Sequence, residues 1–181
     1  MHRTNNFEKY LGVPIITDKR DKRAFDYIID KIRTKLSAWK ARSLSLAGRL
    51  TLVNSITSVI PTHIMQCNLL PTKICNELDR ISRNFLWGDA TSSKKMHVVN
   101  WDIVTLPKHL GGLGIKIIMA CNKALLAKRA WALHTNSPNF WAETLRKKYP
   151  ITSNTIKCKS PAWSSIQKEK VICEKRNQMV N

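Results

Sequence analysis

The chain is short of acidic residues. Its 181 residues include 12 Asp and Glu against 31 Lys and Arg, so the formal net charge is +19 and the sequence pI is about 10.1. A charge this large repels itself unless a polyanion screens it, and nucleic acid is therefore the first partner to consider. A protein that binds polyanions without specificity is the simpler alternative. An anionic membrane surface fits less well, because the basic residues are spread along the chain rather than gathered on one amphipathic helix.

The chain also lacks long apolar runs and a cysteine framework. No uninterrupted apolar stretch approaches the ~20 residues of a membrane span, and the first ten residues, MHRTNNFEKY, lack the apolar segment of a signal peptide. The cysteines are odd in number and far apart, which argues against disulfides and for a reducing compartment. They are Cys67, Cys75, Cys121, Cys158 and Cys173. We therefore expect an intracellular soluble chain with no membrane partner.

Clusters of catalytic groups are missing from the sequence. Polymerase or nuclease chemistry with two metals needs neighbouring carboxylates, and the 12 acids here are scattered. Asp26 and Asp30 share one side of a predicted helix, but they fit better as acids near a helix start, where they oppose the helix dipole. No nucleophile, base and orienting group stand in a recognisable arrangement. The sequence thus predicts no catalytic residue.

Metal ligands and phosphate-binding loops are equally scarce. His63 and Cys67 are four residues apart and could share a helix face, but no further ligand stands at a zinc-binding spacing. The segment GGLG, residues 111–114, has the spacing of neither a dinucleotide fingerprint nor a Walker loop, and it predicts a turn. We expect no metal and no cofactor.

What the sequence does contain is helical periodicity, which predicts a mainly α fold. Residues 21–40 repeat apolar side chains every three to four positions, and they form the clearest helix. Residues 7–16 read as a short extended segment that Pro14 keeps out of any central strand. Residues 98–104 could start a helix or form a short strand. Further helices are predicted over residues 46–60, 71–87, 118–133, 138–149 and 161–176.

The stretch AWKARSLSLAGRLTLV, residues 38–53, combines a helix start with positive charge. Ser45 is the expected N-cap, because its hydroxyl can accept from an early backbone N–H group. Gly48 then falls in the first turn, where a glycine costs less than the ~1 kcal/mol of a helix interior. There it would let a phosphate approach the backbone. Alternatively, Gly48 makes room for Trp39 where two helices pack.

Two long stretches carry basic residues and no acid: from Lys31 to Asn76 and from Ile103 to Ala142. A solvated protein face usually mixes both signs, so these stretches favour a surface that faces a polyanion. The first stretch supplies our candidate phosphate contacts. They are Lys31, Arg33, Lys35, Lys40, Arg42 and Arg49.

Six tryptophans could stack on nucleic-acid bases. They are Trp39, Trp87, Trp101, Trp131, Trp141 and Trp163. We expect most of them to pack in the core instead, since Trp39 and Trp87 lie at or next to the apolar side of predicted helices.

Several stretches, taken in order, are similar to a known family. They are YLGVPI (10–15), LSAWKARSLSLAGRLTLVNSI (36–56), LP (70–71), FLWG (85–88), VNWDIVTLPKHLGGLGI (99–115), NKALLAKRAW (122–131) and FWAETLRKKY (140–149). Together they resemble the segment downstream of the palm in plant LINE-type non-LTR retrotransposon reverse transcriptases. Proteins of that family are often named reverse transcriptase or ribonuclease H protein. Each stretch alone is weak, and the conserved order makes the resemblance specific over most of residues 10–149.

The resemblance implies roles for several segments. Tyr10, Leu11 and Gly12 resemble the last palm motif, next to the primer grip. The basic helices that follow resemble the thumb, which holds the template–primer duplex, and the GGLGI region resembles a connector ahead of a zinc-binding module. The catalytic aspartates of the family belong upstream of YLG, and its zinc ligands belong after the connector. Neither set stands in this sequence, so we expect a fragment that does not catalyse on its own.

These observations combine into one division of the chain and one expected function. The expected segments are a palm remnant (1–20), a thumb-like basic region (21–88), a connector-like region (89–150) and a partly disordered basic tail (151–181). The expected function is to hold an RNA or DNA duplex through its phosphates, in the nucleus if the family role is retained.

Other functions stay open at this stage. The chain could be an orphan remnant with no independent function. It could also work with a separate palm domain as part of an RNA-directed DNA polymerase, or be a polymerase or ribonuclease H enzyme, as family names suggest. A sequence-specific helix-turn-helix reader is the weakest alternative.

Overall fold

The computed structural model is mainly helical, as the periodicity predicts. It describes residues 9–10, 13–14, 25–37, 43–88, 96–135, 138–149 and 160–178. The α-helices are α1 (Asp26–Ser37), α2 (Leu46–Thr57), α3 (Thr62–Met65), α4 (Thr72–Trp87), α5 (Trp101–Val104), α6 (Ile118–His134), α7 (Phe140–Lys148) and α8 (Pro161–Gln178). None of these helices is both long enough and apolar enough to cross a bilayer.

The extended N-terminal segment contains a very short antiparallel pair. Strand β1 (Lys9–Tyr10) pairs with β2 (Val13–Pro14), and Tyr10 lies opposite Val13. Pro14 lies in a two-stranded sheet, where both strands are edges and its missing N–H group is tolerated. Leu11 and Gly12, between the strands, lie outside the described residues.

Contacts divide the chain into two compact units. Unit 1 comprises Met1–His63 and Leu70–Cys121, and unit 2 comprises Ile64–Leu69 and Asn122–Asn181. This division is based on contacts between residues. The four segments proposed from the sequence are based on the roles that the family resemblance implies, and those segments stay a prediction.

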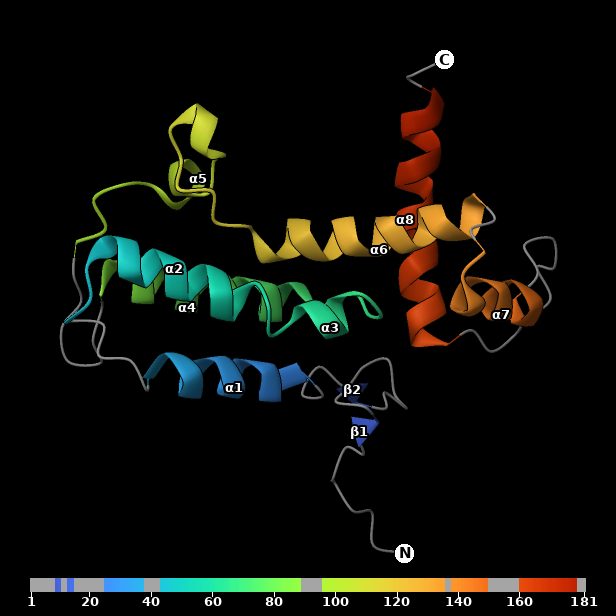
Figure 1. The fold of residues 1–181 in the computed structure, drawn as a ribbon, viewed down its shortest axis with the longest axis horizontal. Helices are drawn as coiled ribbons and strands as arrows, with labels where there is room; N and C mark the ends of the chain where they lie inside the picture. Colours follow the sequence, from blue (N-terminus) through green and yellow to red (C-terminus); the bar gives the residue numbers. More distant parts are fainter. Residues whose placement is uncertain are drawn as a thin grey trace, which may run out of the picture. The chain divides into compact units, whose positions relative to one another are not determined.

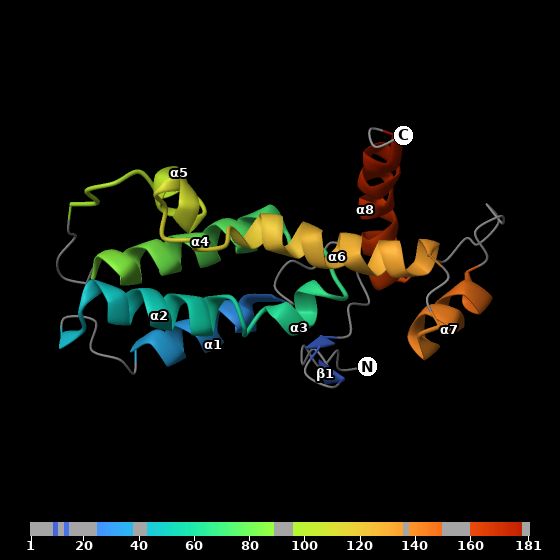
Figure 2. The ribbon, with the colours of Figure 1, turned by 45° about the horizontal axis from the view of Figure 1, so that its top comes forward.

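Unit 1 is built on the three helices α1, α2 and α4, which pack against one another (Figures 1 and 2). Helix α1 buries its apolar stripe, including Ile28, Ile32 and Leu36, as the spacing predicts. Val53 of α2 and Leu78 of α4 are fully buried. Burying a side chain of this size contributes about 1.5–3 kcal/mol, so this apolar core stabilises the three-helix arrangement.

The ends of α2 and α4 follow local sequence signals. Ser45 caps α2, and its Oγ accepts from the Gly48 N–H group at 3.2 Å, as predicted. Gly48 lies in the first turn, also as predicted. Among the described residues, the atoms nearest to a Cβ there belong to Ser45 and Leu44, at 3.6 Å or more, which is ordinary contact. Trp39, the proposed neighbour of Gly48, lies outside the described residues. Gly88 ends α4 in the left-handed conformation, with φ 72°.

The segment after α5 folds back tightly on itself. Asn100 caps α5, so residues 98–104 contain a short helix rather than a strand. The GGLG segment forms the predicted turn: Gly111 has φ 84°, and the Leu113 N–H group donates to the Val104 carbonyl at 2.9 Å. A Cβ on Gly112 would lie 2.0 Å from the Leu106 carbonyl oxygen, so this approach of two backbone segments requires glycine.

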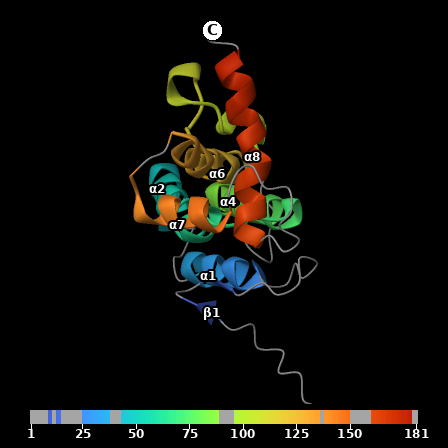
Figure 3. The same cartoon turned by 90° about the vertical axis from the view of Figure 1, so that its right-hand side faces the viewer.

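Unit 2 gathers its core around α6, α7 and α8 (Figure 3). Tyr149 stacks on Trp163 with ring centroids 4.7 Å apart, and both rings are buried. The buried Asn122 amide donates to the carbonyls of Met65 and Asn68 at 2.9 and 3.0 Å, which fixes the 64–69 segment to α6. The remaining buried members of this core are Leu126, Ala130, Leu133, Ala142 and Ile166.

One helix start differs from the prediction. The sequence predicts a helix over residues 138–149, because a serine followed by a proline, Ser137 and Pro138, is typical of an N-cap and first helical position. Instead, α7 begins at Phe140 with Asn139 at the N-cap position. Pro138 lies ahead of the helix, where its restricted φ suits an extended approach as well as a first turn. Ser137 lies outside the described residues.

Candidate nucleic-acid interface

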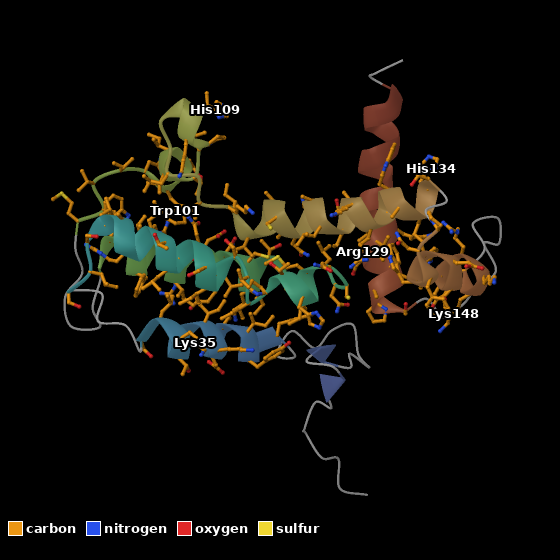
Figure 4. The ribbon with its side chains drawn as sticks, in the orientation of Figure 1. Lys35, Trp101, His109, Arg129, His134 and Lys148 are labelled. Atoms are coloured by element: carbon orange, nitrogen blue, oxygen red, sulfur yellow. The ribbon has the colours of Figure 1, made fainter. Side chains whose placement is uncertain are left out.

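Helix α1 presents basic side chains on two different flanks of its buried stripe. Lys31 and Lys35 are exposed and four residues apart, so they lie on the same flank. Arg33, between them in sequence, lies on the opposite flank, with Asp26 and Asp30. The Lys31–Lys35 flank carries no acidic residue, and Figure 4 marks Lys35 on this helix.

Arg33 forms an ion pair with an acid that lies just beyond the acid-free stretch. Its guanidinium and that of Arg80 both contact the carboxylate of Glu77 on α4, at 2.5 and 2.7 Å. The hydrogen bond from Arg80 is the main reason that the pKa of Glu77 is lowered, and Arg33 lowers it further. One carboxylate shared by two guanidinium groups leaves a net charge of one for the three side chains. Arg33 therefore attracts a phosphate less strongly than an unpaired arginine would.

Arg49 links helix α2 to helix α4 through a hydrogen bond. It is half-buried, and its Nη1 donates to the Leu86 carbonyl at 2.8 Å, near the C-terminal end of α4. A cation suits that end, where carbonyl groups lack helical partners and the dipole is negative. The buried Nε of Arg49 has no hydrogen-bond partner among the described residues. Arg49 thus has a structural contact that the sequence did not reveal.

The other predicted contact residues cannot be placed in full. Lys40 and Arg42 follow α1 and lie outside the described residues. Of the primer-grip-like residues, only the backbone of Tyr10 is described, within β1. The structure therefore packs α1, α2 and α4 together. Of the predicted contact residues that it describes, Lys31 and Lys35 are the two that are exposed and have no acidic residue on their side of the helix.

The second acid-free stretch places basic residues on α6. Lys123 and Lys128 are exposed, whereas Arg129 is half-buried. Arg129 donates to the Gln66 side-chain oxygen at 2.7 Å and lies 4.8 Å from the centre of the Trp141 ring. Figure 4 shows Arg129 and His134 on different sides of this helix. Arg129 therefore serves the packing of unit 2, and the two lysines remain at its surface.

The tryptophans that the structure describes pack as expected with one exception, and Trp39 lies outside the described residues. Trp163 is buried, and Trp87, Trp101 and Trp141 are partly buried. Trp87 stacks on His97 with centroids 6.1 Å apart. Trp131 differs, since 45% of it is exposed. Its position in NKALLAKRAW gave no sign of this, because the alanine-rich helix has apolar residues on every side.

Two titratable groups of unit 1, Asp79 and Cys75, have pKa values that burial raises. Burial raises the pKa of the Asp79 carboxyl to about 6, and this carboxyl accepts from the Ile118 N–H group, at the start of α6, at 3.2 Å. Burial also raises the pKa of the Cys75 thiol to about 11, so Cys75 is no activated nucleophile. Within the described ranges, no three His, Cys, Asp or Glu residues lie close enough to hold a metal.

Comparisons with known proteins give two plant relatives. The chain is 39% identical over 139 residues to a protein of Arabidopsis thaliana named "Putative ribonuclease H protein", across 77% of this chain and 22% of that protein. The chain therefore spans about a fifth of that relative's length. It is also 28% identical over 113 residues to an "Uncharacterized mitochondrial protein" of the same plant, across 59% of this chain and 73% of that protein. No protein-family model matches the chain, and no solved structure matches it significantly.

These relatives bear on the resemblance found in the sequence. Both are plant proteins, and the first carries one of the names that the resemblance predicts. They support a plant, retrotransposon-related chain. The narrower assignment, to the thumb of a LINE-type reverse transcriptase, goes beyond their names and is argued below.

Proposed function

We propose that this chain forms the non-catalytic, duplex-holding part of a LINE-type reverse transcriptase, with α1, α2 and α4 as its thumb. The observation that carries the proposal is the Lys31–Lys35 flank of α1, two exposed lysines one helical turn apart on a side of the helix that carries neither Asp26 nor Asp30. Rows of lysines at this spacing suit successive phosphates of a duplex, because each charge can displace a counterion. The net charge of +19 would attract the duplex from a distance.

The packing narrows the residues on which the proposal rests. Arg33 and Arg49 have intramolecular partners, so Lys31 and Lys35 are the main contacts within the described residues. Lys40 and Arg42 follow the same helix in sequence and remain proposed contacts. The plant relative named for ribonuclease H supports a nucleic-acid partner in general terms.

Salt-dependent binding of a dye-labelled duplex tests this proposal. The wild-type chain should lose affinity steeply as salt rises. The double variant Lys31→Gln/Lys35→Gln should bind more weakly, and its slope of log K against log salt should be shallower by about 2. Binding should change equally for different duplex sequences, because phosphates carry no sequence information.

Lys147→Gln is the matched control. Lys147 is an exposed lysine that already pairs with Glu143 at 2.7 Å, so its loss should leave the slope unchanged. A wild-type slope near zero, or equal slopes for the wild type and the double variant, would contradict the proposal.

A further inference from the structure

The outward side of α6 in unit 2 carries an aromatic and basic surface, and the helix contains no acidic residue. An exposed aromatic ring lies among exposed basic side chains. The residues are Lys123, Lys128, Trp131 and His134. Lys128 and His134 are each three residues from Trp131, so they lie almost one turn before and after it on the same side of the helix.

Within the described residues, the lysines of this surface have no ion-pair partner. Neither Lys123 nor Lys128 forms an ion pair in the described part of the chain, and the stretch from Ile103 to Ala142 contains no acid that could supply one locally. The buried side of α6 already provides the core, through Leu126, Ala130 and Leu133, and Lys123 lies at the edge of that side, two turns before Ala130. The lysines therefore face solvent with their charges available.

Trp131 is exposed where a tryptophan would ordinarily be covered. With 45% of the residue exposed, its indole ring presents a large apolar surface to water. Its described ring contact is an edge-on approach to His134, with centroids 6.0 Å apart and planes 63° apart. The two rings are not stacked in parallel, and the exposed part of the indole leaves room for a flat ligand to contact it.

From these observations we propose that the α6 side formed by Lys123, Lys128, Trp131 and His134 binds unpaired nucleotides of a single strand. Trp131 stacks on a base, and the two lysines contact the flanking phosphates. A base buried in a duplex cannot offer its face to a side chain, whereas an unpaired base can. The site thus differs in ligand and in location from the duplex-holding flank on α1, and it stands without that proposal.

Anisotropy of a dye-labelled oligothymidylate of about 16 nucleotides tests the site directly, beside a duplex of the same labelled strand. Trp131→Ala should weaken single-strand binding about tenfold, the loss of one stacked base, and leave duplex binding unchanged. Trp131→Phe should recover most of the affinity, since phenylalanine also stacks. Lys123→Gln/Lys128→Gln should make the single-strand salt slope shallower by about 1.4.

Phe140→Ala is the control for removing an exposed aromatic ring from the same unit. Phe140 is 85% exposed at the start of α7 and has no role in the site, so this variant should bind like the wild type. Tryptophan fluorescence gives a second measurement that does not depend on the alanine variant folding. Oligothymidylate should quench the wild type more than Trp131→Phe.

The outcomes separate this site from the proposed function. Wild-type single-strand affinity in Trp131→Ala, or equal quenching in wild type and Trp131→Phe, would overturn the stacking site even if the α1 lysines still govern duplex binding. Equal losses for single strand and duplex in Trp131→Ala would also overturn it. A selective single-strand loss would uphold it, even if Lys31→Gln/Lys35→Gln left duplex binding intact.

Discussion

At the scale of single residues, the structure separates charges that face solvent from charges that the fold already uses. Lys31 and Lys35 are exposed without a partner acid on their flank, whereas Arg33 pairs with Glu77 and Arg49 bonds to the Leu86 carbonyl. All four belong to one acid-free stretch of sequence. Equal formal charge therefore does not mean equal capacity to bind a phosphate.

Replacing Arg49 tests its structural role. Arg49→Met keeps most of the side-chain volume but leaves the Leu86 carbonyl without its donor, so it should destabilise unit 1 by about 1–3 kcal/mol. Lys35→Met on the exposed flank should change stability by about 0.5 kcal/mol or less. Urea unfolding of both variants measures this. Equal stability losses would show that the Arg49 contact contributes nothing.

Asp79 should make the stability of unit 1 depend on pH. Burial raises its folded pKa from 3.8 to about 6, so the folded state holds a proton that the unfolded state has already lost. Stability should therefore fall by on the order of 2 kcal/mol as pH rises from about 4 to about 6, and then level off.

Asp79→Asn provides the comparison for that pH dependence. Its amide oxygen can still accept from the Ile118 N–H group, but it carries no charge to desolvate. The difference in unfolding free energy between wild type and variant, measured by urea unfolding across this range, should follow the titration. A difference that stays constant with pH would refute the assignment. Carboxyls such as Glu77, whose pKa is lowered, act oppositely and cancel in the difference.

At the scale of elements, Gly48 and Gly112 differ in how much space their neighbours leave for a side chain. Gly48 lies in the first turn of α2, where a Cβ would make only ordinary contacts. Gly112 lies where a Cβ would overlap the Leu106 carbonyl. The described neighbours of Gly48 therefore leave room for a larger residue, whereas the position of Gly112 requires glycine.

Alanine substitutions should separate the two glycines. Gly48→Ala should leave stability unchanged or raise it by up to about 1 kcal/mol, because alanine favours the helix and restricts the unfolded chain. Gly112→Ala should lower the melting temperature clearly, since the backbone around α5 must shift. Thermal melts followed by circular dichroism measure both. A stability loss in Gly48→Ala would indicate a close neighbour at that position.

At the scale of the whole molecule, the sequence predicted how the chain is built and partly what it binds. The periodicity gave the main helices, and Ser45, Gly88 and the GGLG turn behaved as their local chemistry requires. The similarity to a plant protein named for ribonuclease H agrees with one of the names that the order of motifs implies. The basic excess directs attention to nucleic acid, and binding itself stays a proposal.

The sequence by itself determined the mainly helical class of fold and helix ends such as those at Ser45 and Gly88, because these depend on neighbours within about one helical turn. The sign of the net charge follows from composition alone. Only the tertiary structure decided which charges remain available and which tryptophan is exposed. Glu77 meets Arg33 across 44 positions of sequence, and Leu86 meets Arg49 across 37. Trp131 lies on an alanine-rich helix whose apolar residues surround it, so only packing could select the side that faces solvent.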